Sequence, residues 1–168
     1  MAKNQTQVFS DKEVRQRIQR IAWEIYEIHA KENRLVLAGI SRRGYVLAEL
    51  IAEKLKEISK LEVVLGELNM DKDHPTESGV SFSLSKEEYR NGSVIVVDDV
   101  LNSGKTLIYG VNFFLDVPLK RLTTAVLVDR SHKRYPVKAD VKGVSLSTSL
   151  KETVEVQIEK EPYGVSLV

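Results

Sequence analysis

In the stretch VIVVDDVLNSGKT, Val94–Thr106, a run of apolar residues is followed by two adjacent carboxylates and then by a short loop of small residues. The run itself, SVIVVD over Ser93–Asp98, is typical of a strand buried on both faces of a parallel sheet. A helix is predicted after the loop, over Lys105–Leu115. Because ligands bind open parallel sheets at the carboxyl ends of the strands, this stretch predicts a binding site as well as a fold.

Strand and helix patterns alternate on both sides of this stretch. Apolar residues recur at helical spacing over residues 14–28 and 47–58, and short apolar runs typical of strands occupy residues 34–40, 61–68 and 122–129. Strands that alternate with helices form a parallel sheet with helices on its faces. The sequence therefore predicts an α/β fold with a parallel, Rossmann-like sheet flanked by helices.

Two segments depart from this alternation. Residues 69–91 are polar, contain Pro75 and Gly79, and show little periodicity, so they are predicted to form a long loop of the kind that is usually functional or disordered. From Ser131 onward, short pieces of alternating pattern predict a small β-rich appendage. No linker composition separates two units, and residues 1–168 are expected to form a single domain.

The composition limits the classes of function. The chain has 168 residues, of which 42% are hydrophobic, and this is enough for one sizeable core. Its 25 basic and 24 acidic residues give a net charge of +1, which excludes a strong attraction of the whole chain to nucleic acid or anionic membrane. There is no cysteine, which excludes disulfides and thiolate chemistry. The N-terminus has no apolar signal core and no apolar run approaches membrane-spanning length, so we expect a cytoplasmic protein without a membrane partner.

Two glycine-containing turns are predicted at strand ends, GISRRG over Gly39–Gly44 and DDVLNSGKT over Asp98–Thr106. In the second turn, backbone N–H groups at a helix N-terminus can surround a phosphate group, and the helix dipole favours its negative charge. Gly104 allows close approach of the backbone, and the hydroxyls of Ser103 and Thr106 can donate hydrogen bonds. This turn therefore predicts a phosphate site beside two carboxylates.

Three other interpretations of the second turn fit less well. A Walker A loop requires a glycine where this chain has Asp99, whose charge would oppose nucleotide phosphates. A receiver domain also carries paired acids after a strand, but nothing in it calls for the Ser-Gly-Lys-Thr turn. A solvated turn that caps a helix explains the serine and the glycine, but not two acids at the end of an apolar strand.

The stretch Val94–Thr106 closely resembles the signature of the type I phosphoribosyltransferases. The resemblance implies that Asp98 and Asp99 hold the ribose hydroxyls of phosphoribosyl pyrophosphate. It also implies that the loop holds the 5′-phosphate of this substrate through Leu101, Asn102, Ser103, Gly104, Lys105 and Thr106. The other turn resembles the pyrophosphate loop of the family, so the residues expected to contact the leaving group and its Mg²⁺ are Ser41, Arg42, Arg43 and Gly44.

Within this family, residues 20–27, 125–143 and 147–149 resemble the pyrimidine operon attenuation regulators that are also uracil phosphoribosyltransferases. The resemblance implies transfer of ribose 5-phosphate from phosphoribosyl pyrophosphate to a nucleobase, here uracil, with release of pyrophosphate. It also implies a homodimer or homotetramer. Residues 69–91 differ from the lid segment of these regulators, and this difference predicts slow turnover.

The resemblance also implies roles for individual residues. Asp98, Asp99 and Arg43 are the catalytic candidates, and the general base is left open between the two acids and nearby groups. The expected cofactor is Mg²⁺, placed beside Asp98 and Asp99 and bound mainly through substrate oxygens and water. Val141 stands where an aromatic residue typically covers the base, which predicts weaker stacking on the base.

Two alternatives remain open at this point. One is an RNA-binding regulator with little turnover, because a local basic cluster could contact RNA phosphates; it comprises Arg130, His132, Lys133 and Arg134. The other is a purine phosphoribosyltransferase. Such enzymes generally use a lysine to contact the purine oxygen where this chain has Asp129, and a carboxylate cannot donate a hydrogen bond to that oxygen.

Overall fold

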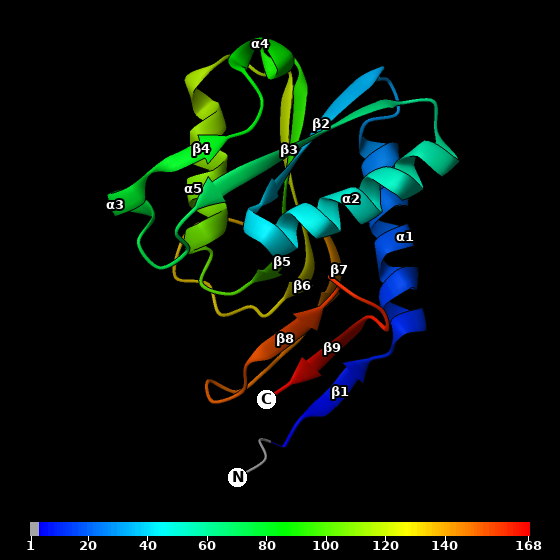
Figure 1. The fold of residues 1–168 in the computed structure, drawn as a ribbon, viewed down its shortest axis with the longest axis vertical. Helices are drawn as coiled ribbons and strands as arrows, with labels where there is room; N and C mark the ends of the chain where they lie inside the picture. Colours follow the sequence, from blue (N-terminus) through cyan, green and yellow to red (C-terminus); the bar gives the residue numbers. More distant parts are fainter. Residues whose placement is uncertain (1–3) are drawn as a thin grey trace.

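The computed structural model describes residues 4–168, and a six-stranded sheet forms its centre (Figure 1). The strands are β2 (Arg34–Ile40), β3 (Glu62–Met70), β4 (Val80–Phe82), β5 (Ser93–Leu101), β6 (Arg121–Asp129) and β7 (Val141–Ser145). Their order is β4-β3-β2-β5-β6-β7, and neighbouring strands are parallel except for the antiparallel edge pair β3–β4. The predicted α/β fold with a parallel sheet is confirmed.

Helices cover both faces of this sheet. One face carries α1 (Asp11–Ile28) and α2 (Ser41–Ile58), and the other carries α5 (Lys105–Phe113), which ends in a short 3₁₀ turn, η1 (Phe114–Asp116) (Figure 1). A capping box between Ser10 and Glu13 begins α1, as the side chain of each residue meets the backbone N–H of the other. In the described part of the chain, no helix combines the length and the apolar character needed to cross a membrane.

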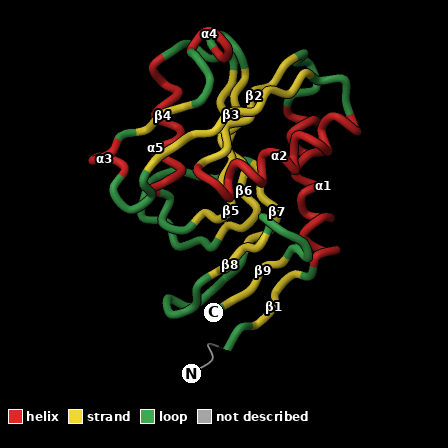
Figure 2. The backbone as a smooth tube through the Cα atoms, in the orientation of Figure 1, coloured by secondary structure: helices red, strands yellow, loops and turns green. Residues whose placement is uncertain are grey.

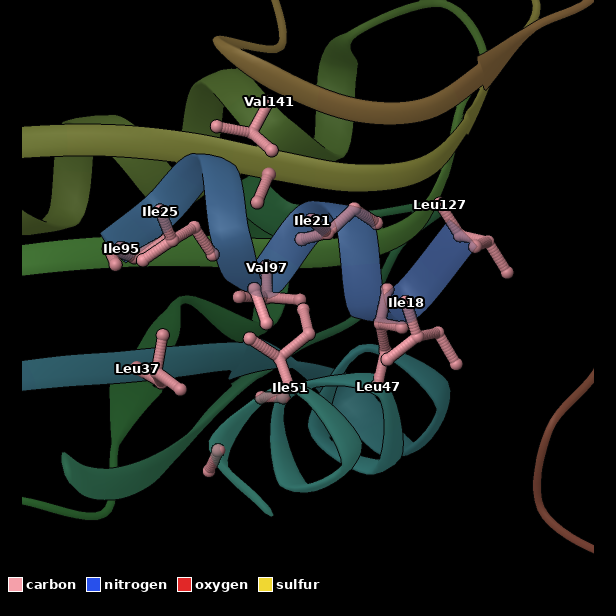
Figure 3. Close-up of a cluster of buried hydrophobic side chains, with 14 of the residues drawn as sticks. Ile18, Ile21, Ile25, Leu37, Leu47, Ile51, Ile95, Val97, Leu127 and Val141 are labelled. Carbon is pink, nitrogen blue, oxygen red and sulfur yellow. The ribbon is translucent and has the colours of Figure 1, made fainter. Parts of the chain in front are cut away.

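The apolar stripe of α1 explains how the first face is filled. Its buried side chains recur every three or four residues, so they form one face of the helix, and they pack against α2 and the sheet. Figure 3 shows how side chains from these helices and strands interdigitate. The labelled members are Ile18, Ile21, Ile25, Leu37, Leu47, Ile51, Ile95, Val97, Leu127 and Val141.

The segment 69–91, predicted as a long loop, is largely structured. It contains α3 (Pro75–Ser78), strand β4 and α4 (Lys86–Tyr89). The reason is a cluster of aromatic rings on the second face, where Phe82 meets Tyr89 and Phe114 edge to face at centroid distances of 5.7 and 5.1 Å. Two aromatic residues in a polar segment therefore dock it on the sheet, and the expectation of a loop without secondary structure was wrong.

The predicted β-rich appendage is confirmed in part. A separate three-stranded antiparallel sheet, here called the hood, comprises β1 (Thr6–Phe9), β9 (Gly164–Leu167) and β8 (Val154–Gln157) in that order (Figures 1 and 2). Strand β7, which was expected in the appendage, instead pairs in parallel with β6 and extends the main sheet. The N-terminal strand β1 joins the hood by pairing with β9, a pairing that the sequence pattern did not reveal.

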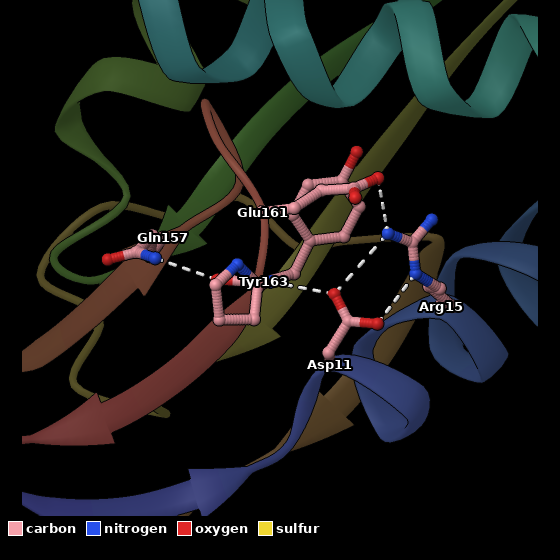
Figure 4. A network of polar contacts seen from close by, with 6 residues as sticks. Asp11, Arg15, Gln157, Glu161 and Tyr163 are labelled. Atoms are coloured by element: carbon pink, nitrogen blue, oxygen red, sulfur yellow. Dashed lines mark hydrogen bonds and ion pairs between the residues drawn. The ribbon is translucent and has the colours of Figure 1, made fainter.

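A polar network fastens the hood to the start of α1 (Figure 4). The carboxylate of Asp11 accepts hydrogen bonds from the Tyr163 backbone N–H at 2.7 Å and from Arg15 Nε at 2.8 Å. Arg15 also donates to Glu161 at 2.7 Å. The bond from Arg15, together with that from Tyr163, lowers the pKa of Asp11 below its ordinary value. The hood is thus held by hydrogen bonds to an ionised side chain of α1.

A buried hydroxyl on β6 is expected to stabilise the segment that leads to β7. Thr124 Oγ1 donates to the Lys138 carbonyl at 2.6 Å and accepts from the Asp140 N–H at 3.0 Å. Replacement of Thr124 by valine keeps the shape but removes both bonds, so the free energy of unfolding should fall by about 1–2 kcal/mol. Urea denaturation measures this change. Replacement of the exposed Thr76 by valine is the control, and an equal stability of both variants would contradict this role of Thr124.

Candidate active site

The carboxyl ends of β2 and β5, which are adjacent in the sheet, place two chain turns side by side. Helix α2 begins at Ser41, directly after β2, so the predicted turn Gly39–Gly44 is the end of a strand and the first turn of a helix. The helix was expected from residue 47 because its first turn is polar. A Cβ atom on Gly44 would lie 2.7 Å from the carbonyl oxygen of Val97, so α2 packs against β5 at contact distance.

Asp98 and Asp99 lie near the carboxyl end of β5, which continues beyond its predicted end at Asp98 to Leu101, and the two carboxylates are buried together. Asp98 is 3% exposed and Asp99 is 5% exposed. The ammonium group of Lys72 lies 3.2 Å from Asp98 Oδ1 and 3.7 Å from Asp99 Oδ1. Arg43 Nη1 lies 3.8 Å from Asp99 Oδ2, so the arginine and the lysine contact different oxygens of Asp99. Two buried acids and two partly exposed cations therefore form one cluster.

Burial raises the pKa of Asp98 to about 7, and the neighbouring charge of Asp99 adds to this increase. Lys72 opposes the increase through its charge and its hydrogen bond. For Lys72 itself, burial favours the neutral amine, but the two carboxylates outweigh burial and raise the pKa of its ammonium group. Lys72 is therefore a cation at neutral pH, and Asp98 changes its ionisation near pH 7.

The loop after β5 has the geometry expected of a phosphate site. Gly104 adopts a left-handed conformation, with φ of 85°, and caps α5, which then runs for nine residues. Ser103 Oγ accepts a hydrogen bond from the Lys105 N–H at 3.2 Å, and the Ser103 carbonyl accepts one from the Arg134 N–H at 2.7 Å. The chain is thus held in a tight turn at the positive end of a helix dipole.

Most of the predicted site residues surround a single cleft of about 170 Å³. Predicted residues that line the cleft are Arg43, Asp98, Asp99, Leu101, Asn102, Ser103, Gly104 and Thr106. Leu101 is itself buried. Two predicted residues do not line the cleft. Arg42 pairs with Glu159, between β8 and β9, at 2.8 Å, and Lys105 Nζ donates to the Asp73 carbonyl at 2.9 Å. Ser41 and Gly44 lie beside it in the first turn of α2.

The expectation that Val141 covers the base was wrong. This residue is 0% exposed and belongs to the core between the sheet and α1 (Figure 3). The cause is the placement of β7, which pairs with β6 in the main sheet and turns the Val141 side chain into that core.

Lys72 is a site residue that the sequence analysis missed. It follows the end of β3 by two residues, and β3 is the neighbour of β2 in the parallel part of the sheet. Because the carboxyl ends of parallel strands meet at the same edge, a lysine at this place in the sequence was a usable signal. It was overlooked because the segment was interpreted as a featureless loop.

The basic cluster after β6 is partly used within the fold. Arg130 Nη1 donates to Asn102 Oδ1 at 3.0 Å, and its Nη2 donates to the Glu152 carbonyl at 2.6 Å. His132 bonds the Thr148 carbonyl at 2.9 Å. At the end of the strand, the carboxylate of Asp129 is buried and pairs with Lys142 at 3.4 Å. Arg130 thereby ties the loop between β5 and α5 to the segment that precedes β8.

The donor set can be compared with what Mg²⁺ requires. Across residues 4–168, no three His, Cys, Asp or Glu side chains gather closely enough to hold a metal ion by themselves. Two adjacent carboxylates do fit an ion whose remaining ligands are substrate oxygens and water, which is the coordination that Mg²⁺ commonly adopts. Asp98 and Asp99 are therefore suited to a metal that is bound jointly with a phosphorylated ligand.

Comparison with known proteins agrees with this geometry. The family model described as the phosphoribosyl transferase domain matches residues 4–161. The chain is 35% identical to the bifunctional protein PyrR of Haemophilus ducreyi, over 90% of this chain and 88% of that protein. It is 38% identical to the PyrR of Streptomyces coelicolor, with 84% and 77% covered, and 33% identical to that of Bacillus subtilis, with 94% and 92% covered.

Solved structures show the same fold. A hypoxanthine-guanine phosphoribosyltransferase from Bacillus anthracis superposes with a TM-score of 0.76 at 16% identity, covering 97% of this chain and 98% of that one. The hypoxanthine phosphoribosyltransferase of Trypanosoma cruzi gives a TM-score of 0.77 at 18% identity, covering 96% and 95%. At this identity the likeness concerns the fold, whereas the family follows from the domain match and from the PyrR relatives. The chain belongs to the phosphoribosyltransferase family.

Proposed function

We propose that this chain transfers the ribose 5-phosphate group of phosphoribosyl pyrophosphate to uracil and releases pyrophosphate. The observation that carries the proposal is the joint presence, at the end of one strand, of two buried carboxylates and a helix-capping glycine loop. Carboxylates accept hydrogen bonds from hydroxyls and repel phosphate, whereas the loop attracts phosphate. A ribose 5-phosphate satisfies both, because its hydroxyls and its phosphate lie at different ends.

The residues divide the substrate between them. The loop 101–106 at the start of α5 holds the 5′-phosphate, and Asp98 and Asp99 accept hydrogen bonds from the ribose hydroxyls. Arg43, in the first turn of α2, lies beside the carboxylates, and we propose that it contacts the pyrophosphate. Holding both ends of the sugar phosphate fixes the reacting carbon, and fixed geometry accounts for much of the rate of such reactions.

The chemical step exchanges one bond at the ribose. The bond from C1 to the pyrophosphate oxygen breaks, the ring becomes positively charged, and a ring nitrogen of the base then bonds C1 from the opposite face and loses its proton. Arg43 stabilises the negative charge that develops on the leaving group. Asp98 and Asp99 would hold Mg²⁺ jointly with substrate oxygens, and the bound ion would supply further positive charge to the leaving group.

Uracil is proposed over purines because of the end of β6. Asp129 cannot donate a hydrogen bond to a purine carbonyl oxygen, and the nearby ammonium of Lys142 is paired with this carboxylate at 3.4 Å. The proposal is also supported by the relatives named bifunctional protein PyrR. We propose that uracil is read largely by backbone groups of the segment 137–143.

The test is a screen of free bases with phosphoribosyl pyrophosphate and Mg²⁺, in which released pyrophosphate is measured. We expect release with uracil, at a low rate because residues 69–91 differ from the lid of the regulators, and little release with hypoxanthine or guanine. Conversion of a purine without conversion of uracil would contradict the choice of base and leave the transfer chemistry in place. No release with any base would contradict the transferase proposal.

The pKa of Asp98 predicts how transfer depends on pH. The ionised carboxylate is the stronger acceptor of hydrogen bonds from ribose hydroxyls, and burial raises the pKa of Asp98 to about 7. The pH dependence of kcat/KM reports ionisation in the free enzyme. Below about pH 7, kcat/KM should therefore decrease with falling pH, with a slope that approaches about tenfold per pH unit, and above about pH 7 it should be constant. A pH profile of wild type and of Asp98→Asn measures this effect. The variant should lack the acid limb, and the same limb in both proteins would assign it to another group.

A second candidate function, binding of RNA as a regulator, is favoured by the bifunctional relatives and by an exposed basic turn. Lys133 and Arg134 are exposed, although Arg130 and His132 are engaged inside the fold. Binding to RNA phosphates should weaken steeply as the salt concentration rises. The affinity for a pyrimidine leader RNA, measured at several salt concentrations, therefore tests whether the chain binds RNA. Affinity that is absent or independent of salt would dismiss the regulator.

We also propose that the chain assembles as a homodimer or homotetramer in solution, as the family resemblance implies. Sedimentation velocity of the full chain measures the state directly. A monomer at every concentration would dismiss self-association.

A further inference from the structure

The segment that carries Lys72 is fastened to both substrate loops. Ser41, in the first turn of α2, donates from Oγ to the Met70 carbonyl at 3.4 Å. From the other side, Lys105 Nζ at the start of α5 donates to the Asp73 carbonyl at 2.9 Å. The backbone on either side of Lys72 is therefore tied to the two turns between which the carboxylates lie, and the lysine is placed over them by structure on both flanks.

The charges of this cluster balance when both acids are ionised. The ion pairs of Asp98 and Asp99 with residues of the described chain involve two cations, Lys72 and Arg43. Two buried negative charges thus meet two positive charges, and the ammonium of Lys72 bridges one oxygen of each acid. A divalent ion that approaches this site meets a neutral cluster rather than a double negative charge, and the nearby ammonium repels it.

We infer that Lys72 is the resident cation of the carboxylate pair in the substrate-free protein, so that a divalent metal enters this site only together with the phosphate groups of its substrate. The inference rests on the proposed function for the identity of that substrate. Lys72 acts through Asp98 and Asp99, and it is therefore a positioning residue that makes binding of the metal depend on the substrate.

Substrate binding can displace this lysine without unfolding the site. Its side chain is 41% exposed, so the ammonium has access to water when ribose hydroxyls take over the carboxylate oxygens. The phosphates of the substrate then bring the negative charge that the cluster lacked, and they supply oxygen ligands of the kind that Mg²⁺ prefers. The neutral cluster becomes a metal site only at that stage.

The test is titration of the full-length protein with Mn²⁺ alone, followed by electron paramagnetic resonance of the free ion. The variants are Lys72→Met, which removes the charge at similar length, and Lys72→Gln, which keeps a hydrogen-bond donor. We expect both to gain one Mn²⁺ site that binds at least tenfold more tightly than any site of the wild type, whereas Lys72→Arg should behave as the wild type. The added substitution Asp99→Asn should abolish the gained site.

A matched control is Lys120→Met, because Lys120 pairs with Glu32 at 3.0 Å outside the cluster. This variant should bind Mn²⁺ as the wild type does, and circular dichroism of each variant verifies folding. Tight Mn²⁺ binding by the wild type that Asp99→Asn removes would overturn the inference, as would the absence of any gain in both neutral variants. These titrations contain no phosphoribosyl pyrophosphate, so their result is independent of whether the base screen shows transfer.

Discussion

Replacement of Asp98 or Asp99 by asparagine should lower kcat/KM for phosphoribosyl pyrophosphate about ten- to a hundredfold, because each change removes a charge-assisted hydrogen bond to ribose worth about 1.5–3 kcal/mol. Asparagine keeps the shape of the side chain but is a weaker acceptor. The fold should persist, since the cations that lose a partner are 41% and 52% exposed in their side chains and can reach water. Steady-state release of pyrophosphate measures the effect.

The control for this prediction is Asp116→Asn in the 3₁₀ turn η1, away from the cleft. It should have the kcat/KM of the wild type. If both site variants kept full turnover, the carboxylate pair would be a structural feature of the strand end and not part of the active site.

Replacement of Gly44 by alanine should damage both stability and activity. The added Cβ would lie 2.7 Å from the carbonyl oxygen of Val97 and 3.4 Å from the Cα atom of Asp98, both backbone atoms of β5. Helix α2 must therefore move away from the strand, and overpacking of this kind costs about 2–3 kcal/mol in the free energy of unfolding. The same movement separates Arg43 from Asp99, so kcat/KM should fall at least about tenfold.

Urea denaturation and the pyrophosphate assay on the same preparation measure these two effects. The control is Gly164→Ala in β9, where the nearest atom to an added Cβ is the Phe9 carbonyl oxygen at 3.7 Å. This control should be close to the wild type in both measurements. Equal stability of the two variants would show that the contact between α2 and β5 is not tight.

The sequence predicted the centre of the fold because its signals there are local. The run from Ser93 to Asp98 reads as a buried strand without reference to any other segment, and Gly104 marks the start of α5 in the same way. Asp98 and Asp99 lie in β5 as predicted, but the strand continues past its predicted end at Asp98 to Leu101, because Val100 and Leu101 still pair with β6.

Other features depend on contacts between distant segments. Val141 was misjudged because the sequence does not show that β7 pairs with β6 in the main sheet rather than joining the hood. The pairing of β1 with β9 joins the two ends of the chain, which no local pattern predicts. Lys72 acquires its role from two acids far along the chain, and the docking of residues 69–91 depends on aromatic contacts with Phe114. Such features become predictable only when the order of strands is known.

The most direct test of the central claim is a crystal structure of the protein with uridine 5′-monophosphate, a product of the proposed reaction. We expect the phosphate within about 2.7–3.2 Å of backbone N–H groups in the loop 101–106, with the ribose hydroxyls on Asp98 and Asp99. Lys72 should have left the two carboxylates. A nucleotide bound elsewhere, or a loop that stays empty while its N–H groups point away from the ligand, would contradict the assignment of this cleft as the active site.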